Sequence, residues 1–83
     1  MEYSFKSSAL KELRKLPTDI QNRLVEKLDR YTETENPLRF ADSIKDFRFG
    51  EYRFRIGDYR ILFDVSGGHI VILKVGHRRD VYR

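Results

Sequence analysis

Apolar and polar residues alternate along residues 52–61, and one Gly57-Asp58 pair interrupts the alternation. A period of two is typical of a strand with one buried face, and a glycine-containing pair is typical of a two-residue hairpin turn. The pattern therefore predicts a hairpin in which Arg55 lies directly opposite Arg60. The predicted core face consists of Tyr52, Phe54, Ile56, Tyr59, Ile61 and Phe63. The other face carries Arg53, Arg55 and Arg60.

Arginines that lie opposite each other need an explanation, because like charges in a cross-strand pair destabilise the pairing. The simplest explanation is that these side chains bind an anion outside the chain. The alternative is a solvated face on which nearby acids pair with the arginines, since surface charges usually have no specific role. The acids expected to pair in this way are Glu51, Asp58 and Asp64.

A second hairpin is predicted around Ser66-Gly67-Gly68, and its register depends on the length of the turn. A two-residue turn places Lys74 on the core face beside Ile70 and Ile72, whereas a three-residue turn leaves it on the arginine face beside Arg60. Burial of a lysine is costly, so we expect the three-residue turn, which pairs Val65 with His69. The core side chains are then Val71, Leu73 and Val75. The apolar side chains expected on the arginine face are Leu62, Ile70 and Ile72.

The N-terminal half predicts a short strand at residues 2–6 and two helices. The first helix runs from Ser7 or Ser8 to Leu13, and Pro17 separates it from the second. The second opens with Thr18-Asp19-Ile20-Gln21, which matches a capping box. Its apolar stripe is Ile20, Leu24, Val25, Leu28 and Tyr31, at helical spacing.

The expected fold is therefore α+β in the order β-α-α-β-β-β. A helical hairpin packs on one face of a largely antiparallel four-stranded sheet, in a single domain spanning residues 1–83. Residues 38–49 give no clear pattern, although Phe47 and Phe49 could begin a strand.

The positive charge of the chain is concentrated in its second half. The whole chain carries a net charge of +4, yet residues 1–42 contain eight basic and eight acidic side chains. Residues 43–83 contain nine basic and five acidic side chains, and seven of the nine are arginine. Arginine suits phosphate because its planar fork binds two oxygens at once. This distribution indicates nucleic acid, an acidic protein or a membrane surface as a partner.

Two stretches, YRFRIGDYRILFDV (52–65) and VGHRRDVYR (75–83), occur in this order around the second hairpin. Together with the strand and helical hairpin before them, they resemble the RelE/ParE superfamily of bacterial and archaeal toxins. The resemblance spans nearly the whole chain. It implies one of two activities: RelE-like members cut mRNA in the ribosomal A site without a metal, whereas ParE-like members inhibit DNA gyrase.

The resemblance also implies a set of site residues. The RelE-like positions fall on Arg53, Arg55, Arg60, Arg78 and Tyr82, and the presence of the full set favours the nuclease branch. RNA can be cut by attack of a 2′-hydroxyl on the adjacent phosphorus, which requires alignment and stabilisation of charge. Arg60 and Arg78 would clamp the scissile phosphate, and Tyr82 or His77 would act as acid or base. Further contacts with RNA are expected from Arg53, Arg55, Lys74, Arg79 and Arg83.

The resemblance further implies a cognate antitoxin whose acidic, partly apolar segment covers the arginine face, including Leu62, Ile70 and Ile72. The other expected partner is mRNA in the ribosomal A site. No cofactor, metal or membrane is expected, because cysteine is absent, the acids lack ligand spacing, and no apolar run is long enough to span a bilayer. A cytoplasmic location is expected. The alternatives are a gyrase inhibitor on the same fold and a catalytically inert binding or regulatory module.

Overall fold

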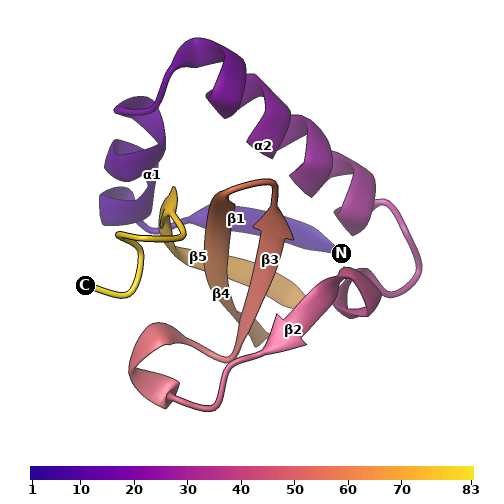
Figure 1. The fold of residues 1–83 in the computed structure, drawn as a ribbon. Coiled ribbons are helices and arrows are strands. Elements are labelled where there is room, and N and C mark those ends of the chain that lie inside the picture. The colour runs from indigo at the N-terminus through magenta and orange to yellow at the C-terminus, as the bar shows by residue number, and fades with distance from the viewer.

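The computed structural model describes residues 1–83 and contains two α-helices, two short 3-10 helices and five strands (Figure 1). The elements in chain order are β1 (Glu2–Phe5), α1 (Ser7–Arg14), α2 (Thr18–Thr32), η1 (Pro37–Phe40), β2 (Ala41–Ser43), η2 (Phe47–Phe49), β3 (Tyr52–Ile56), β4 (Tyr59–Ser66) and β5 (His69–His77). The strands form one sheet in the order β1-β5-β4-β3-β2. β1 is parallel to β5, and every other neighbouring pair is antiparallel. The α+β class is confirmed, but the sheet has five strands and not the predicted four.

The additional strand is β2, which pairs with β3 so that Asp42 lies opposite Arg53. Three residues are too few for alternation to reveal a strand. The strand expected to begin at Phe47 and Phe49 is wrong, because these residues form the 3-10 turn η2. Gly50 then reverses the chain into β3 with φ of 100°, and a Cβ at this position would lie 2.8 Å from Leu73 Cδ1. Both facts favour glycine at this reversal.

The helical hairpin is joined differently from the predicted capping box. Pro17 occupies the N-cap position of α2, and no side chain caps the helix. The side chain of Gln21 instead donates from Nε2 to the carbonyl of Leu16 at 2.8 Å and to that of Arg14 at 3.2 Å. Gln21 therefore ties α2 to the end of α1. Neither helix combines the length and apolarity that a membrane crossing demands.

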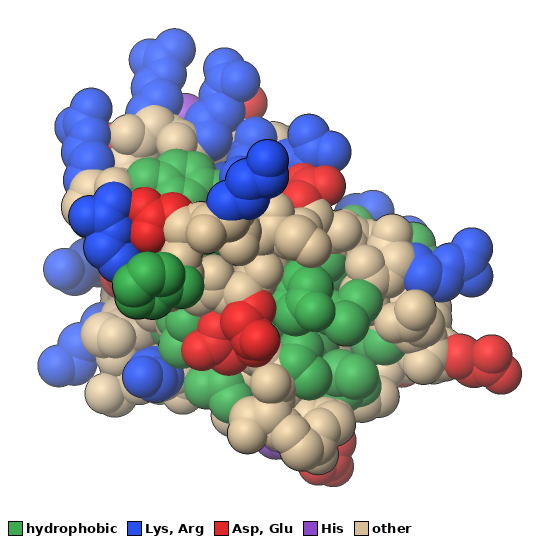
Figure 2. Space-filling model, turned by 90° about the horizontal axis from the view of Figure 1, so that it is seen from below, with side chains coloured by type: hydrophobic (Ala, Val, Ile, Leu, Met, Phe, Trp, Pro, Cys, Tyr) green, Lys and Arg blue, Asp and Glu red, His purple; other side chains and the backbone are tan.

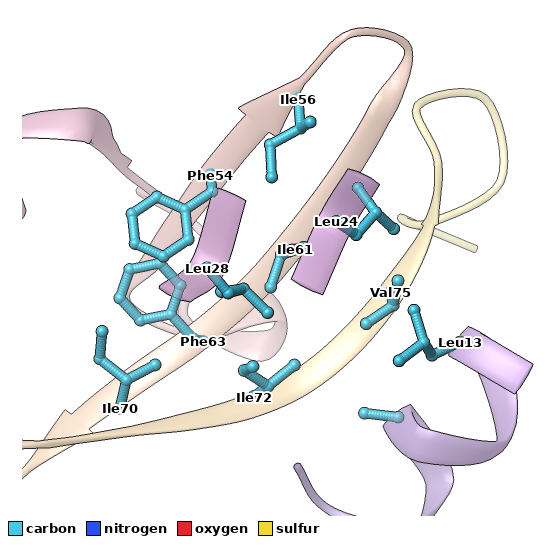
Figure 3. Close-up of a cluster of buried hydrophobic side chains, with 11 residues drawn as sticks. Leu13, Leu24, Leu28, Phe54, Ile56, Ile61, Phe63, Ile70, Ile72 and Val75 are labelled. Atoms are coloured by element: carbon cyan, nitrogen blue, oxygen red, sulfur yellow. The ribbon is translucent and has the colours of Figure 1, made fainter. Parts of the chain in front are cut away.

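The two helices cover one face of the sheet (Figure 1). The residues after β5 reach the other face, where Tyr82 and Arg83 bind Arg53 and Lys74. Seen from below, the molecule has Lys and Arg side chains along its upper edge and a hydrophobic area that surrounds acidic side chains (Figure 2). The core lies between the helices and the sheet, as Figure 3 shows. Its buried members are Ala9, Leu13, Leu24, Leu28, Phe54, Ile56, Ile61, Phe63, Ile70, Ile72 and Val75. The predicted helical stripe and first-hairpin core face are thus confirmed, with Ile20, Val25, Tyr31, Tyr52 and Tyr59 at the core margin.

The first hairpin has the predicted register. Ile56 pairs with Tyr59, and Arg55 pairs with Arg60 across the turn. Gly57 adopts φ of 59°, as a tight hairpin turn requires. The alternation on both strands was unambiguous because each has aromatic or branched residues on one face and arginine on the other.

The second hairpin does not have the predicted register. Its turn has two residues, Gly67 and Gly68, so that Ser66 pairs with His69. A bulge then shifts the register: Phe63 pairs with Ile72, and Leu62 pairs with Lys74. The extra residue, Leu73, reverses the alternation in the middle of β5. Lys74 therefore lies on the arginine face, as expected, although it faces Leu62 and not Arg60.

The two-residue turn overturns the expected position of two apolar residues. Ile70 and Ile72 lie in the core and are fully buried, so their predicted place on the arginine face is wrong. Val75 lies in the core as predicted, whereas Val71 and Leu73 do not belong to the buried cluster. A single bulge allows β5 to bury Ile70, Ile72 and Val75 while it keeps the lysine outside.

Candidate functional site

The candidate site is the face of β3 and β4 that points away from the helices. Arg53 and Arg55 come from β3, Arg60 comes from β4, and Arg55 and Arg60 are direct cross-strand partners. Strand geometry places opposite Cβ atoms about 5 Å apart, so these charges repel unless something lies between them. The face has no pocket, and no group of three or more potential ligands gathers to hold a metal ion. Such an open, positive surface suits an extended anion better than a small molecule.

The counter-ion for the β3 arginines comes from the edge strand. Asp42 on β2 places Oδ2 at 2.7 Å from Arg55 Nε and at 3.4 Å from Arg53 Nε. The sequence suggested Glu51 and Asp64 for pairing, but their carboxylates accept backbone N–H groups of Val65 and Glu51. Asp42 was missed because β2 itself was not predicted.

Tyr82 joins the arginine face from the other end of the chain. Arg53 donates from Nη1 to the Tyr82 hydroxyl at 2.8 Å, and this hydrogen bond is the main cause that raises the pKa of Arg53 above its ordinary value. The Tyr82 ring also packs edge-on against Phe49 of η2, with ring centroids 5.2 Å apart. The predicted association of Tyr82 with the arginines is therefore present, and Phe49 is a supporting residue that sequence reasoning missed.

The tail folds back over the sheet after β5 ends. Arg53, Leu62 and Lys74 form one row across β3, β4 and β5. Tyr82 binds Arg53 at one end of this row, and Lys74 Nζ donates to the Arg83 carbonyl at 3.1 Å at the other. Leu62, in the middle, is 0 % exposed. The tail thus closes over Leu62, and the prediction that Leu62 offers a free apolar surface to a partner is wrong.

A second group of cations surrounds the Gly57-Asp58 turn. Arg60 turns back to the hairpin and donates from Nη1 to the carbonyls of Gly57 and Tyr59, at 2.9 Å each. Arg78 is tied to the same turn, because its backbone N–H donates to the Asp58 carbonyl at 2.8 Å and its Nε lies 3.6 Å from Asp58 Oδ1. Arg60 and Arg78 therefore both contact the Gly57-Asp58 turn.

His77 does not join this group. It pairs across the sheet with Tyr59, whose side chain faces the core margin, so the imidazole lies on the face opposite to Arg60. The rings of Tyr59 and His77 meet edge-on at 5.5 Å, and His77 Nδ1 accepts the backbone N–H of Arg79 at 3.2 Å. Of the two predicted acid–base residues, only Tyr82 lies among the arginines.

The remaining predicted cations lie at the rim. Arg79 is exposed and makes no ion pair, while Arg83 lies 3.8 Å from Asp80 in a weak exposed pair. Sequence reasoning also missed Phe47, which is 89 % exposed on the same 3-10 turn that carries Phe49. An exposed ring beside a basic face is typical of surfaces that stack on unpaired bases.

A family model described as the ParE toxin of the type II toxin-antitoxin system parDE matches residues 3–82. Toxin RelG of Mycobacterium tuberculosis is 36% identical over 81 residues, which cover 95% of this chain and 92% of the relative. Toxin RelE3 of Methanocaldococcus jannaschii is 28% identical over 85 residues, covering 99% of this chain and 96% of the relative.

A solved structure, the toxin-antitoxin complex RelBE2 from Mycobacterium tuberculosis, contains a similar chain with a TM-score of 0.75 and 31% identity. The match covers 93% of this chain and 96% of that one. Sequence and structure comparisons thus agree on the same group of toxins over almost the full length.

Proposed function

The chain belongs to the RelE/ParE family of toxins of type II toxin–antitoxin systems, and on that premise we propose that it cuts messenger RNA. The observation that supports the nuclease reading most strongly is the 2.8 Å hydrogen bond between Arg53 and Tyr82. It holds a hydroxyl group that can exchange a proton on the same open face as the three arginines of β3 and β4. A purely adhesive surface would not require the tail to fold back and deliver a phenol to this position.

The proposed reaction is attack of a ribose 2′-hydroxyl on the adjacent phosphorus, which yields a cyclic phosphate and a free 5′-hydroxyl. Arg60 and Arg78, gathered at the Gly57-Asp58 turn, stabilise the charge that develops on the phosphorane oxygens. Arg53 and Arg55 neutralise flanking phosphates. Because Arg53 donates to the Tyr82 oxygen, the hydroxyl hydrogen remains available to the 5′ oxygen that leaves as the P–O5′ bond breaks, while solvent takes the proton of the attacking 2′-hydroxyl.

Cleavage is proposed to depend on the ribosome. The face has no pocket that could hold an RNA chain in a bent, reactive geometry, and only one acid–base candidate lies on it. Alignment of the attacking hydroxyl with the phosphate contributes a large part of such catalysis, so a second body must supply it. RNA in the A site meets this need, because the ribosome fixes its path, and the cytoplasm is then the place of action. The exposed ring of Phe47 would stack on a neighbouring base.

The proposed inhibitor is a cognate antitoxin. A related chain is found in a toxin–antitoxin complex, and the open face here offers cations that an acidic segment can neutralise. Since Leu62, Ile70 and Ile72 are buried, the apolar part of such a segment must bind elsewhere on the surface.

A second candidate function is inhibition of DNA gyrase, which the match to a ParE family model favours. One experiment distinguishes the two functions. The chain is induced in bacteria without a partner, incorporation of methionine and thymidine is followed, and mRNA 5′ ends are mapped. The nuclease proposal predicts rapid arrest of methionine incorporation with new in-frame mRNA ends. Arrest of thymidine incorporation with intact mRNA would support the gyrase function, and no effect on either would support an inert module.

The matched variants are two double substitutions. Arg60→Ala with Arg78→Ala removes two positive charges from the face, whereas Arg14→Ala with Arg30→Ala removes two from the helices. The proposal predicts that the first pair abolishes toxicity and the second pair retains it. Full toxicity of the first pair would contradict the assignment of the site.

A further inference from the structure

Asp42 is the acidic residue that lies closest to the arginines of β3. Its side chain is 38% exposed, and one oxygen serves both Arg53 Nε at 3.4 Å and Arg55 Nε at 2.7 Å. The cross-strand register, which pairs Asp42 with Arg53, fixes this position. No other carboxylate lies within ion-pair distance of either arginine.

The interaction occupies the groups that would otherwise grip a phosphate. Arginine binds phosphate most tightly through two parallel N–H groups, and the Nε edge supplies one of them. On Arg55 the Nε is taken by Asp42. On Arg53 the Nε faces Asp42 while Nη1 is taken by Tyr82. Neither arginine is free to present its full side-on fork.

We propose that Asp42 is an intramolecular competitor of RNA phosphate at Arg53 and Arg55, and that it weakens the binding of free RNA. A phosphate that approaches Arg55 must displace this carboxylate or tolerate its negative charge. RNA held by a second body can meet that requirement, whereas a free strand binds too few other groups to do so. Asp42 would thereby restrict the toxin to positioned message, an inference that rests on RNA being the ligand of the proposed function.

The test is binding of a fluorescein-labelled single-stranded RNA, made uncleavable by 2′-deoxy substitution, measured by anisotropy at several NaCl concentrations. Asp42→Asn keeps the shape of the side chain but removes its charge. We expect binding about threefold to tenfold tighter than wild type at low salt. The dependence of log affinity on log salt should also steepen by up to about 0.7 for each additional phosphate that the variant neutralises.

The chain offers a matched control in Asp46→Asn. Asp46, the N-cap of η2, pairs with Arg48 at 2.6 Å and has a side chain 39% exposed, close to that of Asp42, so this variant also frees one arginine and adds one positive charge. If net charge alone governs binding, both variants tighten equally, and the proposal is overturned. We expect the increase in affinity for Asp46→Asn to be clearly smaller.

A double variant identifies the group that is released. Asp42→Asn combined with Arg55→Gln should lose most of the increase in affinity, whereas an increase that persists would contradict the proposed competition. Thermal unfolding confirms that each variant is folded, and Asp42→Ser replaces Asp42→Asn if the latter is not. Equal or weaker binding by a folded Asp42 variant would also overturn the proposal.

The role of Asp42 and the nuclease function can be refuted independently of each other. Cleavage of ribosome-bound mRNA by the wild-type chain, with no tightening by Asp42→Asn, would refute the role of Asp42 alone. Tighter binding by Asp42→Asn without any cleavage by the wild-type chain would refute the nuclease function and retain the role of Asp42.

Discussion

The side chains on the two faces of the sheet are stabilised in different ways. The face under the helices is closed, because apolar side chains from α1 and α2 meet those of β3, β4 and β5 with no charge among them. On the opposite face the positive charges are balanced only in part. Asp42 pairs with Arg53 and Arg55, and Asp58 pairs with Arg78. The stability of the fold explains the apolar side chains of the first face. The excess positive charge of the second is unfavourable for folding and therefore indicates a ligand.

The largest expected effect on stability comes from the covered face. Phe54 is fully buried and stacks on Phe63 with ring centroids 4.5 Å apart. Phe54→Ala should lower the free energy of unfolding by about 3–5 kcal/mol, because it removes the ring and leaves a cavity. Urea unfolding followed by circular dichroism measures this change. A loss below about 1 kcal/mol would mean that the core is packed differently.

Arg60→Ala should have a small effect on stability and a large effect on cleavage. Its guanidinium donates only to the backbone carbonyls of Gly57 and Tyr59, so we expect a loss of unfolding free energy of about 1 kcal/mol. Cleavage of ribosome-bound mRNA should fall by about 10² to 10³, as when one oxyanion donor is removed from an active site. Arg30→Ala, which removes a helix arginine paired with Glu26, is the matched control and should cleave normally.

Two substitutions of Tyr82 distinguish its role in the reaction from its role in packing on the open face. Tyr82→Phe keeps the ring against Phe49 but removes the oxygen that accepts from Arg53. We expect stability within about 1 kcal/mol of wild type and a cleavage rate lower by about 10². Tyr82→Ala, which also removes the ring that packs on Phe49, should lose stability as well. Normal cleavage by Tyr82→Phe would exclude the hydroxyl from the reaction.

Glu12 of α1 links the helical layer to the last part of β5. Its Oε1 accepts the backbone N–H of Val75 at 3.1 Å, beyond the point where β1 ceases to pair with β5. Glu12→Ala should lower the free energy of unfolding by about 1–3 kcal/mol, because that donor loses its partner. Glu12→Gln retains an acceptor and should behave almost as wild type in the same urea titration. Equal losses in both variants would implicate the charge and not the hydrogen bond.

The smallest expected effect is a pH dependence at Tyr3. Burial, together with the hydrogen bond from its hydroxyl to Asp29 at 2.7 Å, raises the pKa of Tyr3 to about 12. A folded-state pKa above the unfolded value stabilises the fold fully below pH of about 10, and that contribution is lost as the pH rises towards 12. Wild type should therefore lose more stability between these values than Tyr3→Phe. Parallel stability profiles would contradict this account.

The sequence predicted the covered face better than the open one, and the difference has a physical cause. The core positions of α2 and the first hairpin follow regular periods, so Leu24, Leu28 and Phe54 could be placed without coordinates. The register of the second hairpin could not, because the bulge at Leu73 breaks the period, and each register considered assumed unbroken alternation. Burial of Ile70 and Ile72 follows from the two-residue turn, whereas the extra residue Leu73 keeps Lys74 off the core face and brings Val75 onto it.

The site was predictable where it lies on the regular hairpin and not where it depends on tertiary contacts. Arg55 and Arg60 follow directly from the turn, whereas Asp42 depends on a three-residue edge strand with no pattern of its own. His77 lies on the core face, and the predicted three-residue turn, which placed Val75 on that face, already implied this position by alternation. Contacts between distant segments, such as Arg53 with Tyr82, leave no local signal in the sequence.

The central claim is that the open face cuts RNA on the ribosome, and one measurement tests it most directly. Purified ribosomes are programmed with a defined mRNA whose A-site codon is empty, the full chain is added, and the ends of any fragments are analysed. The account predicts one cut in the A-site codon, with a 2′,3′-cyclic phosphate on one fragment and a 5′-hydroxyl on the other, and a loss of cutting in Arg60→Ala. Intact mRNA with the wild-type chain, or equal cutting by wild type and Arg60→Ala, would contradict it.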